Sequence, residues 1–145
     1  MDEGGFTLIE MMVVITIIGL ASAVAVLAMP DPRGRLLDEA TTFAARTRAA
    51  HDSAIIGAKP VSVWVSPGGY GFDERSGGQW HPVAEKPLRV AQWGRDVRPA
   101  LAVERQRVVF DTTGLADSAL DVRLVRGDES EIVRIGLDGS VRVGG

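Results

Sequence analysis

The chain has 145 residues, of which 46% are hydrophobic and 24% charged, and its formal net charge is -3. It contains no cysteine, which excludes a disulfide framework, a Cys-based zinc site and a thiol nucleophile. The near-neutral balance does not indicate a nucleic-acid partner, and the length allows one globular domain with a substantial core.

The chain begins with a long apolar segment that contains one acid. Between Phe6 and Met29 the only charged residue is Glu10. As a helix this segment would extend about 36 Å, enough to cross a hydrocarbon core of about 30 Å. A carboxylate near the start of such a span is costly unless something compensates it, so Glu10 is the first candidate functional residue.

The end of the apolar helix is marked by two prolines. Pro30 and Pro32 each lack an N–H and disfavour helical geometry in the preceding residue. We therefore expect the helix to stop or kink near Met29, with a boundary over residues 30–34.

A secretory signal peptide is the main alternative for this segment. Its apolar region would be Met11 to Leu20, with small residues for cleavage at Ala21 to Ala23. Such peptides begin with Lys or Arg, whereas the first basic residue here is Arg33. A retained membrane anchor is the better interpretation.

The segment Leu36 to Ile56 has the periodicity of an amphipathic helix. Gly57 suits the position just past the helix end, and Pro60 prevents continuation. His51 lies in this helix and is predicted to be a surface or boundary residue, not a metal ligand. The apolar or small residues at three- and four-residue spacings are Leu36, Leu37, Ala40, Phe43, Ala44, Thr47, Ala50 and Ala54.

From Val61 onward, short β-like segments alternate with turn signals, which predicts an antiparallel β domain. Asp138-Gly139 is the strongest hairpin signal and suggests a type I′ turn. Together these patterns predict an α+β fold, in which a long N-terminal helix, half transmembrane and half amphipathic, packs on an antiparallel two-sheet β domain. The candidate strands are residues 61–65, 70–73, 79–83, 97–103, 107–111, 121–126, 131–137 and 140–143.

No catalytic pattern stands out. Phe110 to Gly114 reads FDTTG, in which an extra threonine spoils the spacing of an aspartic-protease motif, and no second copy supplies the paired carboxylate. A strand that ends in a polar turn explains it better. Asp117, Asp121, Asp128 and Glu129 do not follow a calcium-loop spacing. We therefore expect no enzyme activity, no cofactor and no metal, and we assign Tyr70, Phe72 and Trp80 to packing.

The sequence GFTLIE from Gly5 to Glu10, followed by the apolar segment, resembles the type IV pilin superfamily, which includes the pseudopilins of type II secretion. The resemblance implies that a prepilin peptidase cuts between Gly5 and Phe6 and methylates the new amino terminus at Phe6. It also implies that Glu10 meets the amine of a neighbouring subunit during fibre assembly. On electrostatic grounds alone, Glu10 could equally neutralise its own Phe6 amine or be protonated.

The leader departs from the family pattern at Asp2 and Glu3, because such leaders usually carry Lys or Arg that hold the amino terminus in the cytoplasm. A start further upstream and an orientation imposed by the secretion machinery both remain open. Removal of these two acids with the leader changes the formal charge from -3 to -1.

Three later stretches narrow the resemblance to the minor pseudopilin H family of type II secretion and its FimT-like pilus relatives. They are residues 37–60 (LDEATTFAARTRAAHDSAIIGAKP), 69–83 (GYGFDERSGGQWHPV) and 107–115 (RVVFDTTGL). The resemblance implies a leader over residues 1–5, a transmembrane and assembly helix over 6–29, a kink and amphipathic helix over 30–59, and a periplasmic β domain over 60–145.

The implied function is that of a structural subunit near the tip of the type II secretion pseudopilus, anchored in the inner membrane by a single pass. Its partners would be the prepilin peptidase and other minor and major pseudopilins, with no nucleic acid. The alternative is a FimT-like minor pilin that binds DNA for uptake. For that function the candidate phosphate contacts are Arg123, Arg126, Arg134 and Arg142.

Overall fold

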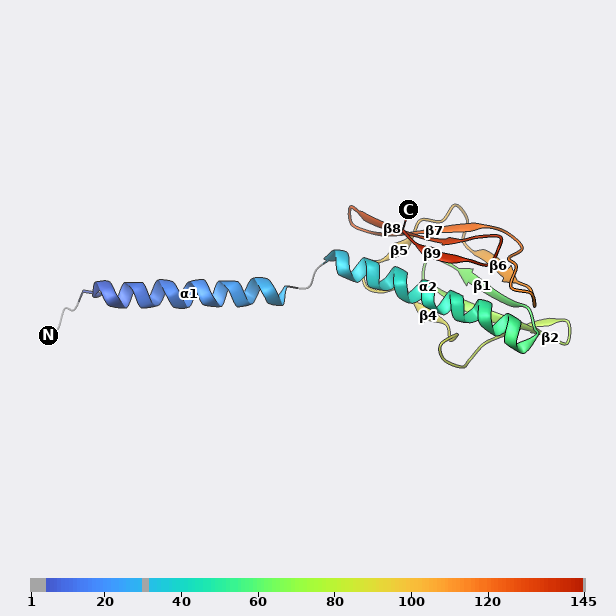
Figure 1. The fold of residues 1–145 in the computed structure, drawn as a ribbon. Helices are drawn as coiled ribbons and strands as arrows, with labels where there is room; N and C mark the ends of the chain where they lie inside the picture. The colour runs from blue at the N-terminus through green and yellow to red at the C-terminus, as the bar shows by residue number, and fades with distance from the viewer. Residues whose placement is uncertain (1–4, 30–31, 145) are drawn as a thin grey trace. The chain divides into compact units, whose positions relative to one another are not determined.

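The computed structural model describes residues 5–29 and 32–144, and the chain divides into two compact units between Asp31 and Pro32 (Figure 1). The leader residues 1–4, and residues 30–31 of the predicted boundary, lie outside the described residues.

The first unit contains one helix, α1 (Leu8–Ala28). Its amino end is capped by Thr7, and at its carboxyl end Met29 adopts an extended conformation with φ -67° and ψ 121°. The predicted end of the helix near Met29 is confirmed.

The second unit begins with α2 (Pro32–Gly57). This helix starts about one turn earlier than predicted, because proline is well tolerated in a first turn. Its buried stripe matches the predicted one except at Leu37, which is 45% exposed, since it lies about 100° around the helix from Leu36. The buried members are Leu36, Ala40, Phe43, Ala44, Thr47, Ala50 and Ala54.

The end of α2 also differs from the prediction. Gly57 is the last helical residue, and the left-handed position that follows is taken by Ala58 with φ 50°. The Ala58 N–H donates to the carbonyl of Ile55 at 3.4 Å. The helix therefore ends one residue later than predicted, with Gly57 inside it.

The remainder folds into two antiparallel sheets against which α2 packs, and Figure 1 shows α2 lying across their strands. The first sheet has the order β3-β2-β1-β6, with β4 also paired to β2, and the second has the order β5-β7-β8-β9. The predicted α+β class with two antiparallel sheets is confirmed. The strands are β1 (Val61–Val65), β2 (Gly69–Ser76), β3 (Gln79–Pro82), β4 (Ala91–Gln92), β5 (Arg98–Pro99), β6 (Gln106–Phe110), β7 (Leu120–Arg126), β8 (Glu129–Ile135) and β9 (Val141–Val143).

Strand prediction fails between β3 and β6. The predicted strand over residues 97–103 contains only the two residues of β5, and β4 was not predicted. Both pair over two residues, β4 with β2 and β5 with β7. Such short pairings depend on partners distant in sequence, so local composition carries little information about them.

Aromatic rings join α2 to the first sheet. The ring centroid of Phe43 lies 4.8 Å from that of Tyr70 and 5.4 Å from that of Trp93, in edge-to-face arrangements that favour aromatic packing. Burial raises the pKa of the Tyr70 hydroxyl, an effect that the nearby Arg46 cation opposes. Tyr70 and Phe72 are buried in the core, which agrees with the packing role predicted for them, and Trp80 is half-buried in the β2–β3 hairpin.

Arg48 of α2 holds the last strand. Its Nε and Nη2 both donate to the carbonyl oxygen of Val141 in β9, at 3.1 and 2.7 Å. A charged donor gives a stronger hydrogen bond than a neutral one, so this contact ties the helix to the second sheet.

The turn between β8 and β9 forms the predicted hairpin, with a different geometry. Gly139 has φ 82°, but Asp138 is not in the left-handed region, so the turn is not type I′. Gly136 N–H donates to the carbonyl of Ser140 at 2.9 Å. The Asp138 carboxylate accepts from the Ser140 backbone N–H at 3.0 Å and from its hydroxyl at 2.6 Å. This longer loop is a type I-like turn followed by one residue in the left-handed region, which is Gly139.

A matching turn follows β6. Asp111 accepts through Oδ1 from Thr113 N, Thr113 Oγ1 and Leu115 N at 2.8, 2.6 and 3.1 Å. Gly114 takes the left-handed position with φ 87°. The sequence FDTTG is therefore a strand that ends in a polar turn, as predicted.

Candidate functional site

The amino end of α1 is organised by Thr7 and Glu10. The Thr7 Oγ1 accepts a hydrogen bond from the backbone N–H of Glu10 at 3.1 Å, and the Thr7 carbonyl accepts from Met11 N at 3.0 Å. This is one half of a capping box, in which a threonine caps the helix and an acid follows three residues later. Thr7 was not predicted to be the cap, although the Thr-x-x-Glu spacing is the signature of a capping box.

The candidate site residues occupy the first turn of α1 and the residues before it. Gly5 and Phe6 precede the helix, and the Phe6 side chain is 75% exposed. Glu10 lies inside the first turn, where an acid is favoured by the helix dipole. Because Phe6 lies ahead of the helix, its four-residue separation from Glu10 is not a helical spacing in this chain.

The Glu10 carboxylate is unpaired. Within residues 5–29 and 32–144 it has neither an ion-pair partner nor a hydrogen-bond partner. An acid at the edge of an apolar span is costly in that state. The negative charge of the Glu10 carboxylate is therefore available to pair with a cation from outside the described residues.

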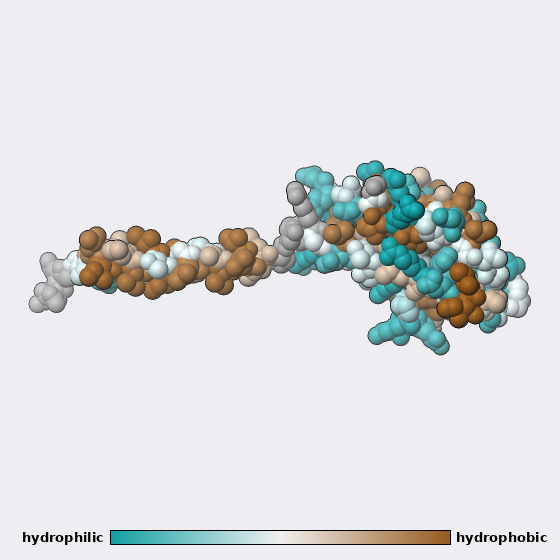
Figure 2. Space-filling model, in the orientation of Figure 1, coloured by the Kyte–Doolittle hydropathy of each residue, from teal (hydrophilic) through white to brown (hydrophobic). Residues whose placement is uncertain are grey.

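The polar side chains in the rest of α1 make their hydrogen bonds within the helix. Thr16 Oγ1 donates to the Met12 carbonyl and Ser22 Oγ to the Ile18 carbonyl, both at 2.8 Å, so each hydroxyl is satisfied within the helix. All of its residues are exposed, and most of the face seen in Figure 2 is apolar. By length and composition, this helix is long and apolar enough to cross a membrane.

Three of the four candidate phosphate-binding arginines share a face of the second sheet. Arg134 of β8 pairs across the sheet with Asp121 of β7 and with Arg142 of β9, and Arg123 lies on the same side of β7 as Asp121. The Asp121 carboxylate lies 3.8 Å from Arg134 Nε. Arg126 belongs to the opposite side by strand alternation. The face is therefore a mixture of charges.

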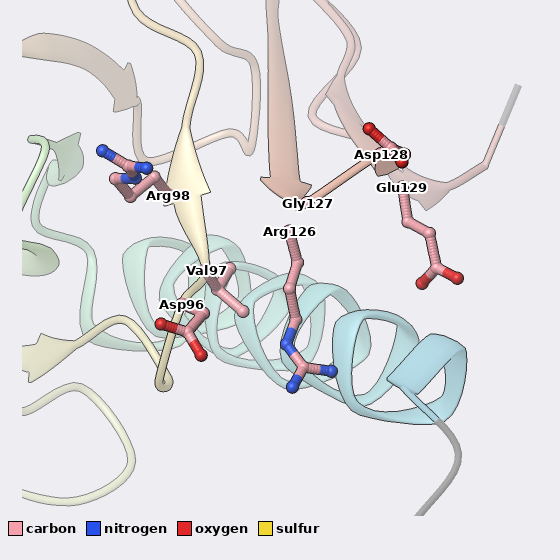
Figure 3. Close-up of a pocket in the computed structure, with 7 residues that line it drawn as sticks. All are labelled: Asp96, Val97, Arg98, Arg126, Gly127, Asp128 and Glu129. Atoms are coloured by element: carbon pink, nitrogen blue, oxygen red, sulfur yellow. The ribbon is translucent and has the colours of Figure 1, made fainter.

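A hollow of about 790 Å³ lies where β5, β7 and β8 meet (Figure 3). Three acids and two arginines line it, and in Figure 3 the side chains of Arg98 and Arg126 point in different directions. A catalytic site needs groups that converge on one reacting atom, and this arrangement lacks that convergence. Its lining residues are Asp96, Val97, Arg98, Arg126, Gly127, Asp128 and Glu129.

His51 is half-buried and packs on the first sheet. Its ring centroid lies 5.5 Å from that of Phe110, and its Nδ1 lies 3.0 Å from the Asp52 carboxylate. In the part of the chain that the structure describes, no group of three or more His, Asp or Glu side chains could hold a metal ion. The predicted boundary position of His51 is confirmed.

Comparison with known protein families gives two matches. Residues 1–26 match the prokaryotic N-terminal methylation motif, and residues 39–140 match the family of type II transport protein GspH. No curated protein sequence matches the chain.

Two solved structures show the same fold. The type IV minor pilin FimU of Pseudomonas aeruginosa superposes with a TM-score of 0.60 at 17% identity, covering 78% of this chain and 90% of FimU. The minor pseudopilin EpsH from the type 2 secretion system of Vibrio cholerae superposes with a TM-score of 0.64 at 14% identity, covering 75% of this chain and 95% of EpsH.

The methylation motif covers the capped start and most of α1, and the second match covers most of α2 and the strands from β1 to β8. This family and fold are those of structural pilin and pseudopilin subunits rather than enzymes. The chain belongs to the type II transport protein GspH family.

Proposed function

We propose that this chain is a minor pseudopilin, a structural subunit near the tip of a type II secretion pseudopilus that supports export of folded proteins across the outer membrane. Residues 1–5 form the leader, and residues 6–29 cross the inner membrane once and pack in the fibre. Residues 30–59 form the kink and amphipathic helix, and residues 60–145 form the β domain in the periplasm.

The observation that carries this proposal is the Glu10 carboxylate in the capped first turn of α1, which has no partner among the described residues. Cleavage between Gly5 and Phe6 creates an amine with a reference pKa of about 8, mostly a cation at neutral pH. Both groups are costly to desolvate, so the pair is favourable only when the two charges meet closely. We propose that Glu10 compensates the Phe6 amine of a neighbouring subunit.

Small residues on α1 would allow neighbouring helices to approach closely. A Cβ added at Gly19 would meet nothing within 4 Å, so this position is open on the isolated helix. Ala23, four residues on, extends this small surface on the same side of α1, and Ala21 and Ala25 form a second small pair on the other side. Close backbone approach at small residues is a common basis of helix association in membranes.

The amino terminus of the mature protein tests the processing. Mass spectrometry of the protein purified from its own membrane should show N-methylated Phe6. A terminus at Val24 would indicate a signal peptide and would contradict the proposed anchor. Unmodified, uncleaved chain in a strain with an active prepilin peptidase would also contradict it.

The export role has a separate test. An in-frame deletion of the gene should reduce the export of folded proteins to the medium, and the wild-type gene supplied in trans should restore it. Normal export together with a loss of pilus-dependent motility or DNA uptake would contradict the secretion proposal.

The second candidate function is a minor pilin that binds DNA. It is favoured by the shared face of Arg123, Arg134 and Arg142 and by the likeness to FimU. The acid Asp121 within that face opposes phosphate binding. Salt-dependent binding of duplex DNA, weakened when Arg123 and Arg142 are both changed to Gln, would favour this function over secretion.

A further inference from the structure

The side of the first sheet that faces away from α2 carries tryptophans and arginines. Val61, Val63 and Val65 of β1 are fully buried on the helix side, so alternation places Trp64 on the opposite side. Its register partners there are Gly71 of β2 and Arg107 of β6. Arg75 of β2 pairs with Trp80 of β3 on the same side. We call Trp64, Arg75, Trp80, Arg105 and Arg107 the Trp–Arg face.

Trp64 is held between a backbone and a cation. A Cβ on Gly71 would lie 2.6 Å from Trp64 Cε2, so the indole ring lies directly on that glycine. The Cζ of Arg105 lies 3.9 Å from the Trp64 ring centroid. Since the backbone occupies one side of the ring, the guanidinium covers the other, in a cation–π stack.

Trp80 is flanked by two further guanidinium groups. The Cζ atoms of Arg107 and Arg75 lie 5.5 and 5.8 Å from its ring centroid. Arg107 is compensated, because its Nη2 donates to the Asp73 carboxylate at 2.7 Å, and Asp73 is buried. This ion pair crosses the centre of the sheet and fixes one arginine in place.

Arg75 and Arg105 have no such charge partner within residues 5–29 and 32–144. Among the residues that the structure describes, neither has a carboxylate partner or a hydrogen bond to an acceptor. Stacking occupies the flat side of a guanidinium and leaves its in-plane N–H donors free for a bidentate acceptor. The face therefore presents two free cations in a chain whose formal net charge is -3.

The two cations of this face favour an anionic partner, and the packing of the tryptophan rings decides between a nucleic acid and a polypeptide. Nucleic-acid bases need free aromatic rings on which to stack, but Trp64 is covered on both sides. Two uncompensated cations would also neutralise only about two phosphates. We propose that the Trp–Arg face is a docking surface for an acidic polypeptide segment, whose carboxylates bind Arg75 and Arg105 across the two tryptophans.

The test uses the full chain in nonionic detergent and three fluorescently labelled probes. The probes are a capped peptide of alternating Val and Glu, the same peptide with Gln in place of Glu, and an oligothymidylate. Fluorescence anisotropy at low salt should show saturable binding of the Glu peptide only. Removal of one charge-assisted contact should weaken it about tenfold in Arg105→Gln and in Arg75→Gln.

Arg95→Gln is the matched control, because Arg95 is also exposed and has no ion pair or hydrogen bond with any described residue. It should leave the affinity for the Glu peptide within about twofold of wild type. Unchanged circular dichroism of all three variants excludes unfolding as the cause. Absence of Glu-peptide binding, or an equal loss in Arg95→Gln, would overturn the proposal. Tighter binding of the oligothymidylate that is lost in Arg105→Gln would overturn it in favour of a nucleic-acid surface.

Discussion

Gly139, in the turn between β8 and β9, lies directly against the carbonyl oxygen of Gly114 in the turn after β6. The Ala116 N–H also donates to the Leu137 carbonyl at 3.0 Å, so the two sheets are joined at this point. His51 of α2 covers both turns, because a Cβ on either glycine would lie 2.7 Å from its Nε2. One junction thus holds the helix and both sheets together.

Gly139→Ala should destabilise the protein strongly. The new Cβ would overlap backbone that cannot move freely, and φ 82° is unfavourable for any other residue. We expect the free energy of unfolding to fall by about 2–5 kcal/mol. Gly127→Ala is the control, because Gly127 has φ 59° with nothing within 4 Å, and it should cost about 1–2 kcal/mol. Urea denaturation measures both, and equal losses would show that the junction is not tightly packed.

Asp111 and Asp138 should make the turns sensitive to acid. Side-chain hydrogen bonds from Thr113 and Ser140, respectively, are the main reason that the pKa of each carboxyl lies below its ordinary value. A lowered pKa in the folded state stabilises the protein above the unfolded pKa of about 3.9, and this stabilisation is lost as the pH falls through the folded pKa. The free energy of unfolding should therefore decline below about pH 4.

The double variant Asp111→Asn with Asp138→Asn isolates this effect. Its free energy of unfolding should change less between pH 5 and pH 2, as approximate limits, than that of wild type. Asp128→Asn should retain the wild-type decline, because the Asp128 carboxylate has no hydrogen bond to any described residue. An unchanged decline in the double variant would assign the acid sensitivity to other groups.

Phe43→Ala removes the ring that joins α2 to Tyr70 and Trp93. Phe43 is fully buried, so the free energy of unfolding should fall by about 3–5 kcal/mol. Leu37→Ala lies on the same helix but at an exposed position, and it should change this free energy by about 0.5 kcal/mol or less. Similar losses in the two variants would contradict the packing of α2 on the sheets.

Glu10→Ala should leave leader removal intact and block incorporation into the fibre. The Thr7 cap uses the backbone of residue 10, so α1 should still form, but the proposed partner charge is lost. Glu10→Gln should fail in the same way if the charge is required. Thr16→Val is the control, because its hydroxyl bonds only within α1. Processed Phe6 and cross-linked fibre are the two readouts, and normal incorporation of Glu10→Ala would refute the role of this carboxylate.

Local sequence patterns predicted the elements whose buried residues recur at a regular spacing. The stripe of α2 follows helical periodicity, and only Leu37 was misplaced, because it adjoins Leu36 in sequence but not on the buried face. β4 and β5 could not be predicted, since each depends on two residues of a distant strand. The turn at Asp138 was recognised, but its type depends on Ser140 and on the contact with Gly114.

The functional residues also divide into those that local sequence can identify and those that only the folded chain brings together. GFTLIE identified the segment around Glu10, and Thr7 could have been recognised as its cap from spacing alone. The stack of Arg105 on Trp64 could not, because nothing local relates residues 64, 71 and 105. Their proximity exists only once β1, β2 and β6 are paired.

The contact between Arg48 and the Val141 carbonyl has a consequence for how other chains can meet this domain. β9 is the edge strand of its sheet, and edge strands normally offer unpaired backbone groups to an incoming strand. Here a cation from the same chain already occupies one of the outward acceptors of a three-residue edge. An added strand would have to displace it, so growth by strand addition is disfavoured here, and recognition through side-chain surfaces is favoured instead.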